Sequence, residues 1–150
     1  MDKKIKPFDL EIQTLGFYVN RVFYMMTKKL NDELKKSGLD IQHAEFTIIK
    51  VLGVLGSATQ SQIAAALGKE RSGISRSLAV LEKKELIRRT LLNGSTNNVE
   101  LTEKGIDALP LLNRVTDSVT EMAFRGFSQK SRISVINNLN KMYKNALEDE

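Results

Sequence analysis

The sequence predicts a mainly α-helical chain with one small β-hairpin, an α+β arrangement with long helices towards both ends. Three observations support this class. Apolar residues recur every three or four positions over most of the chain. Two short helical segments meet at Gly68, and two β-prone runs enclose the Asn-Gly pair at Asn93. With 150 residues, the chain has the length of one domain with its own core.

A long first helix is predicted to end at Ser37-Gly38. Lys35 and Lys36 would lie favourably near the negative end of its dipole. The expected length is about 28 residues, which is long for a small domain. The apolar stripe consists of Leu15, Val19, Val22, Met26, Leu30 and Leu34, widened by Phe8, Ile12, Phe23 and Met25.

A second helix is predicted to follow Asp40, which is a plausible N-cap residue. Its buried side would hold Phe46, Ile49 and Leu52. Either Gly53 or Gly56 would end this helix.

The next two helices are short and are joined by a tight turn. Thr59 and Gln62 form a capping-box pattern that opens a helix from Gln60 to Leu67, and Gly68 ends it. Another helix starts within a few residues, which is a helix-turn-helix pattern. Ile63 and Leu67 would be buried in the first helix, and Ile74, Leu78 and Leu81 in the second.

The opposite face of the second short helix carries no acid and no bulky apolar side chain. It consists of Ser72, Ser75, Arg76, Ala79 and Lys83. A small, polar and basic face suits the DNA major groove, because it can offer hydrogen-bond donors to phosphates and base edges.

A β-hairpin is predicted directly after this helix. The runs from Leu86 to Leu92 and from Val99 to Leu101 are β-prone, and the segment from Asn93 to Asn98 is the expected turn. A hairpin in this position is a wing, so the centre of the chain predicts a winged helix-turn-helix.

Two further helices complete the chain. Thr102 is predicted to cap the first, and Pro110 should kink or divide it. Ser128 is predicted to cap the last helix. The apolar positions are Leu112, Val115, Val119, Met122 and Ala123 in the first helix, and Ile133, Ile136, Leu139, Tyr143 and Leu147 in the last.

The positive charge is concentrated in one window. The net charge is +5, and residues 69–89 contribute +4 of it with seven basic and three acidic side chains. A solvated charged face is the ordinary interpretation of such a window. Its position on a helix-turn-helix favours double-stranded DNA as the partner.

Several classes of protein do not fit the sequence. Because no apolar run could span a bilayer and no signal peptide is recognised, we expect a cytoplasmic protein with no membrane partner. The chain has no cysteine, and His43 is its one histidine, so no metal site and no redox-sensing thiol are expected. The sequence has neither a nucleophile elbow nor a phosphate-binding glycine loop. We therefore expect no enzyme, no catalytic residue and no cofactor.

Three local motifs resemble the multiple-antibiotic-resistance regulator (MarR) family. They are LGKERSGISR at 67–76, LEKKELIRR at 81–89 and LTEKG at 101–105, and the resemblance extends over essentially the whole chain. It implies a homodimer with interlocked terminal helices, whose two winged regions face successive major grooves of a pseudo-palindromic operator. It also implies a single domain over 1–150, with dimerisation helices at 1–38 and 106–150 and a winged helix-turn-helix at 40–105.

The family resemblance also implies a function and a set of site residues. Many members are repressors released by small aromatic ligands, so we expect a ligand-responsive transcriptional repressor with a small aromatic effector. Aromatic residues at 17, 18, 24 and 46 would line an effector pocket or, alternatively, the core and dimer interface: Phe17, Tyr18, Tyr24 and Phe46. The expected DNA-binding residues are Ser61, Gln62, Lys69, Arg71, Ser72, Ser75, Arg76, Lys83, Arg88, Arg89 and Asn97.

Two departures from the family pattern leave an alternative open. Family wings usually carry an arginine near the tip, whereas residues 93–98 have no charge. A glycine is also common in the family where this chain has Glu85, so a left-handed helix end here would cost about 1 kcal/mol or be replaced by another ending. The alternative function is a winged-helix protein-interaction module that has lost or weakened DNA binding.

Overall fold

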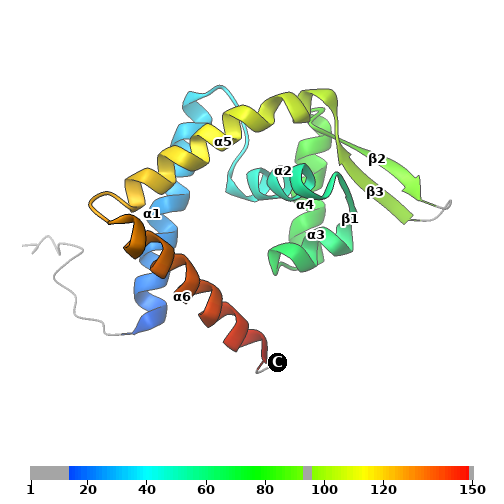
Figure 1. Cartoon of the computed structure of the whole chain (residues 1–150). Helices are drawn as coiled ribbons and strands as arrows, with labels where there is room; N and C mark the ends of the chain where they lie inside the picture. Colours follow the sequence, from blue (N-terminus) through cyan, green and yellow to red (C-terminus); the bar gives the residue numbers. More distant parts are fainter. Residues whose placement is uncertain (1–13, 93–95, 149–150) are drawn as a thin grey trace, which may run out of the picture. The chain divides into compact units, whose positions relative to one another are not determined.

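A computed structural model describes residues 14–92 and 96–148 and confirms the predicted fold class. The chain divides into two compact units, Met1–Thr116 and Asp117–Glu150. Figure 1 labels the elements, which are α1 (Leu15–Lys36), α2 (His43–Leu55), β1 (Ser57–Thr59), α3 (Gln60–Leu67), α4 (Arg71–Lys83), β2 (Ile87–Leu92), β3 (Thr96–Leu101), α5 (Glu103–Ala123) and α6 (Gln129–Glu148).

Helix α1 ends where the sequence predicts, at Lys36, and is shorter than expected within the described part of the chain. The predicted contributions of Phe8 and Ile12 fall outside the described residues. Only Leu30 and Leu34, in the last two turns of α1, are buried. Leu15, Val19 and Val22, which form the predicted apolar stripe over its first two turns, are exposed.

The N-cap of α2 is Gln42, so the prediction that Asp40 caps this helix is wrong. The carboxylate of Asp40 instead accepts a hydrogen bond from Lys84 Nζ at 2.7 Å. Asn31 on α1 supplies an acceptor for the helix start, because its Oδ1 lies 2.8 Å from the backbone nitrogen of His43. Helix α2 continues through Gly53 and ends at Gly56, where φ is +75°.

The helix-turn-helix forms as predicted. Gln62 N–H donates to Thr59 Oγ1 at 3.3 Å, and Thr59 N–H donates to Gln62 Oε1 at 2.8 Å, which completes the capping box. Gly68 ends α3 in the left-handed region. Ile63, Ile74, Leu78 and Leu81 are buried, whereas Leu67 is only half-buried.

The sheet contains one strand that the sequence analysis missed. The strand order is β1-β3-β2, and both pairs are antiparallel. Strand β1 has only three residues, too few to show a period-two pattern, and it forms because buried Ala58 pairs with Val99. Figure 1 shows β2 and β3 extending beyond helices α2, α3 and α4.

The predicted turn of the hairpin was too long. Strand β3 begins at Thr96, so Asn97 and Asn98 are strand residues opposite Leu91 and Thr90. Backbone pairing with β2 here outweighs the turn preference of asparagine, which is only a local tendency. The remaining predicted turn residues, 93–95, lie outside the described part.

Helix α5 begins as predicted but is not divided at Pro110. Thr102 Oγ1 accepts a hydrogen bond from Gly105 N–H at 3.1 Å, and the helix runs without interruption from Glu103 to Ala123. Pro110 is exposed, so water can solvate the backbone carbonyl that loses its helical donor there. The helix is held beyond the proline by buried Leu112 and Val115.

Gly105 marks the closest approach between α5 and the segment that enters β2. A Cβ atom at this position would lie 2.1 Å from the carbonyl oxygen of Leu86. Glycine is the only residue that allows the two backbones to lie this close.

In the second unit, Ser128 caps α6 as predicted, since its Oγ accepts a hydrogen bond from Ser131 N–H at 3.2 Å. Arg132 donates through both Nη atoms to the two carboxylate oxygens of Glu121, at 2.5 and 3.0 Å. Helix α6 has no buried residue. Its exposed apolar residues are Ile133, Ile136, Leu139, Met142, Tyr143 and Leu147.

No helix in the described ranges is both long enough and apolar enough to cross a membrane.

Candidate nucleic-acid interface

The outward face of α4 presents polar and basic side chains. Ile74, Leu78 and Leu81 fix the orientation of the helix by packing into the core, and they leave Arg71, Ser72, Ser75, Arg76 and Lys83 exposed. Gln60 Nε2 donates to the Arg71 carbonyl at 3.0 Å and so ties α3 to the first turn of α4. No side-chain hydrogen bond or ion pair of Arg71, Arg76 or Lys83 is found among the described residues. These three cations are free to meet an anionic partner.

The predicted DNA-binding residues of α3 and of the turn precede α4 directly in the sequence. They differ in how much of each side chain is left to contact a partner. Ser61 and Lys69 are exposed. Gln62 uses its amide oxygen in the capping box at Thr59, so its NH₂ group is the part left for a partner.

Both predicted arginines of the wing form ion pairs. Arg88 Nε lies 2.6 Å from Glu100 Oε1, directly across the hairpin, and Arg89 Nε lies 3.1 Å from Glu82 Oε2 on α4. Because neighbouring residues of a strand point to opposite faces, the two guanidinium groups lie on opposite faces of the hairpin. Asn97 is exposed on β3 opposite Leu91.

The segment that leads from α4 to the wing is held by two side chains near the start of α5, in a role that the sequence analysis did not assign to them. Glu85 is the one residue other than glycine with a positive φ in the described part, at 59°. Thr102 Oγ1 donates to the Glu85 carbonyl at 2.6 Å, and Lys104 Nζ donates to the Lys84 carbonyl at 2.8 Å. Because these contacts join residues 17 and 20 positions apart, the motif at 101–105 that contains both side chains does not predict them.

The pKa values of Asp40 and His43 are both lowered, for different physical reasons. Lys84, through its hydrogen bond, lowers the pKa of Asp40, which keeps this carboxylate ionised. Burial, and then the positive charge of Lys69, lower the pKa of His43, which also packs edge-on against Phe23. No group of three or more potential metal ligands occurs among the described residues.

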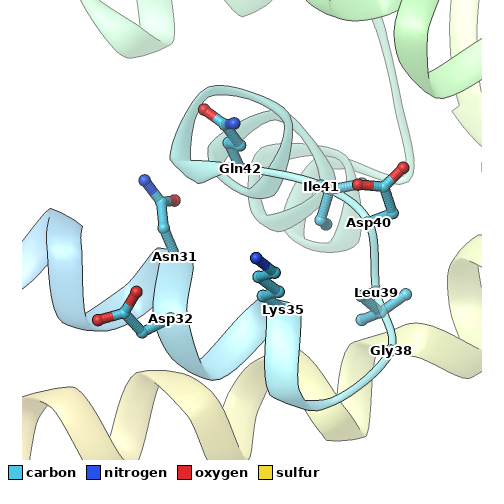
Figure 2. A pocket seen from close by; sticks show the side chains of 8 residues that line it. All are labelled: Asn31, Asp32, Lys35, Gly38, Leu39, Asp40, Ile41 and Gln42. Carbon is cyan, nitrogen blue, oxygen red and sulfur yellow. The ribbon is translucent and has the colours of Figure 1, made fainter.

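A cavity of about 340 Å³ lies between the end of α1 and the start of α2 (Figure 2). It is lined by Asn31, Asp32, Lys35 and residues 38–42. None of the four aromatic residues predicted for an effector pocket lines this cavity. Phe17 and Tyr18 contact each other with ring centroids 5.7 Å apart, Tyr24 is exposed, and Phe46 is buried in the core.

The geometry defines a winged helix-turn-helix protein. Residues 37–93 match the family model described as MarR family, which confirms the resemblance predicted from the sequence for this part of the chain.

Solved structures show the same fold over most of the chain. A MarR transcriptional regulator from Methanosarcina mazei Go1 aligns with a TM-score of 0.84 and 18% identity, covering 94% of both chains. A mutant of MarR from E. coli in complex with operator DNA aligns with a TM-score of 0.76 and 20% identity, covering 93% of this chain and 99% of that one. Bordetella bronchiseptica BpsR, described for regulation of its DNA binding by 6-hydroxynicotinic acid, aligns with a TM-score of 0.78 and 16% identity, covering 85% and 97%.

Proposed function

We propose that this chain is a sequence-specific DNA-binding transcriptional regulator that acts as a homodimer on a pseudo-palindromic operator. The exposed face of α4 carries the proposal, because Arg71, Arg76 and Lys83 have no acidic partner among the described residues. The fold shared with an E. coli MarR mutant solved in complex with operator DNA supports the same function. The proposed contacts are those predicted from the sequence, with α4 in the major groove and the wing on the flanking backbone.

The homodimer is proposed from the apolar surface of the terminal helices. Helix α1 exposes Leu15, Tyr18, Val19 and Val22, and α6 exposes Ile133, Ile136 and Leu139. Contiguous apolar surfaces mark interfaces in soluble proteins. We assign dimerisation to residues 1–38 and 106–150, and DNA binding to residues 40–105.

We further propose that the regulator is a repressor that a small aromatic acid releases. The support is the reported regulation of BpsR by 6-hydroxynicotinic acid, a protein of the same fold. A panel of hydroxylated benzoic and nicotinic acids should lower operator affinity at saturating concentration. Unchanged affinity across the panel would contradict this part of the proposal. With no cysteine in the chain, peroxide should have no direct thiol-mediated effect.

The test of DNA binding compares two arginine variants. Arg76→Ala should cost about 1 to 3 kcal/mol on the operator and relax the preference at one position of each half-site, because Arg76 lies in the middle of the α4 face. Arg89→Ala should weaken binding to all sequences alike and lower the salt slope by about one unit per contact, hence about two per dimer. Fluorescence-anisotropy titrations at two salt concentrations would measure both effects.

Arg114→Ala serves as the control, because Arg114 is an exposed arginine of α5 outside residues 40–105, the proposed DNA-binding region. It should change affinity and salt slope less than either variant. Affinity that is insensitive to salt would instead favour the protein-interaction module, because counterion release dominates DNA binding.

A further inference from the structure

The two ion pairs of the wing use the same atom of the arginine side chain. Arg88 contacts Glu100 through Nε, and Arg89 contacts Glu82 through Nε. Neither arginine uses its terminal Nη atoms in a hydrogen bond with another described residue. Each guanidinium is therefore held at its inner nitrogen, while its outer fork of N–H donors is left open.

Arg132 in the second unit shows the opposite use. Both of its Nη atoms donate to Glu121, and Nη2 also lies 3.4 Å from the Phe124 carbonyl. Both of its Nη atoms are therefore engaged by partners, as expected of an arginine that joins two helices. The chain therefore contains two kinds of paired arginine. In one kind the acidic partner binds the Nη atoms, and in the other it binds only Nε and leaves the Nη atoms free.

The acidic partners hold the wing arginines from two different elements. Glu82 is in the last turn of α4 and fixes Arg89, whose side chain is only 24% exposed. Glu100 is the cross-strand partner of Arg88, whose side chain is 66% exposed. One open fork is thus presented on each face of the hairpin, and a phosphate oxygen pair fits such a fork.

We infer that Glu82 and Glu100 are positioning residues that hold Arg89 and Arg88 with their Nη groups ready to bind DNA phosphates. This inference rests on the proposed function, since it explains how the wing would bind DNA through Arg88 and Arg89 although residues 93–98 have no charge. An arginine that is already ordered loses less rotamer freedom on binding. Against this gain, each carboxylate repels the polyanion.

Positioning and charge repulsion can be separated, because they predict opposite changes in DNA affinity for Glu82→Ala. Glu82→Ala removes both the repulsion and the positioning, whereas Glu82→Gln removes the repulsion and keeps an oxygen that accepts the Nε–H bond. Positioning therefore predicts that Glu82→Ala lowers affinity about three- to tenfold. It also predicts that Glu82→Gln binds as tightly as the wild type or more tightly. Repulsion alone predicts that both variants bind more tightly.

The experiment uses the full chain and a DNA duplex enriched by the wild-type protein from a random-sequence library. Affinity and salt slope are measured for wild type, Glu82→Ala and Glu82→Gln, and thermal melting checks that all are folded. The salt slope of Glu82→Ala should fall as it does in Arg89→Ala, because the same phosphate contact is lost. The pair Glu100→Ala and Glu100→Gln should show the same pattern through Arg88.

Glu70 provides the matched control. It is an exposed acid just before α4 that makes no side-chain capping bond. Its Ala and Gln variants should shift affinity in the same direction, because only charge is removed. In an Arg89→Ala background, Glu82→Ala should no longer weaken binding, since there is no side chain left to position.

Three outcomes would overturn the inference: tighter binding by both Glu82 variants, equal weakening by both, or weakening by Glu82→Ala that persists without Arg89. Failure of the proposed function is distinguishable from these, because the wild-type protein would then enrich no duplex at all.

Discussion

Glu85 shows how a single residue can be kept in an unfavourable conformation by its surroundings. Its φ of 59° lies in the region where a Cβ atom is strained. Thr102 and Lys104 hold the carbonyls of Glu85 and Lys84 in this turn. The turn is therefore fixed by Thr102 and Lys104 at the start of α5, whatever residue occupies position 85.

Replacing Glu85 by glycine should stabilise the protein. Glu85→Gly is expected to raise the free energy of unfolding by about 1 kcal/mol, because glycine adopts this φ without a steric penalty. The exposed Lys104 pair that is lost, at 3.9 Å, contributes little. Urea denaturation would measure the change. Glu85→Ala is the control and should give no such gain, since alanine has the same Cβ strain.

Glu121 should make stability depend on pH. Its bonds to Arg132 hold its pKa below the ordinary value of 4.5. A carboxylate with a lowered folded pKa stabilises the fold above its unfolded pKa and loses this contribution as pH falls through the folded value. The melting temperature of Glu121→Gln should therefore lie below that of the wild type at about pH 7 and approach it as the pH falls through the lowered pKa of Glu121. A difference that stays constant with pH would contradict this account.

At the scale of the helix or strand, the sequence predicts elements well where the signal is local. Thr59, Gly68 and Ser128 each act within a few residues, and each occupies the predicted cap. Local sequence patterns do not predict an element that depends on a distant partner. Strand β1 depends on pairing with β3, and the start of α2 depends on Asn31 of α1. The ion pairs of Arg88 and Arg89 are likewise set by the hairpin register and by α4, so sequence spacing does not predict their geometry.

Asn31 should stabilise α2 although it belongs to α1. Its Oδ1 accepts one of the N–H groups that the first turn of a helix leaves unpaired. Asn31→Ala should lower the free energy of unfolding by about 1 kcal/mol, as loss of a helix cap does. Asn31→Asp keeps the acceptor and should lose much less. Thermal or urea unfolding would measure the stability of the two variants. Equal losses of unfolding free energy in both would argue against a capping role for Asn31.

At the scale of the whole molecule, each of the two terminal helices carries apolar side chains that are exposed. Val22 of α1 is 56% exposed and Ile136 of α6 is 48% exposed. We expect the protein to sediment as a dimer at micromolar concentration in analytical ultracentrifugation. Val22→Glu or Ile136→Glu should shift it towards monomer, because a buried unpaired carboxylate is unfavourable at an interface.

Asn20→Glu and Asn137→Glu are the matched controls for these variants, because they add the same charge at exposed polar positions of the same helices. They should leave the dimer intact. A wild-type protein that sediments as a monomer would contradict the proposed homodimer and, with it, the proposal of a pseudo-palindromic operator.

Substitution of Gly105 should make regulation by this protein sensitive to temperature. Because a methyl group there would meet the Leu86 carbonyl, Gly105→Ala has to push α5 away from the base of the wing without touching the reading face of α4. We expect a conditional allele, with regulation retained in the cold and lost on warming as the strained junction opens. In a saturation screen for regulatory function at the warmer temperature, position 105 should tolerate no other amino acid, whereas neighbouring Ile106, 55% exposed, should accept many.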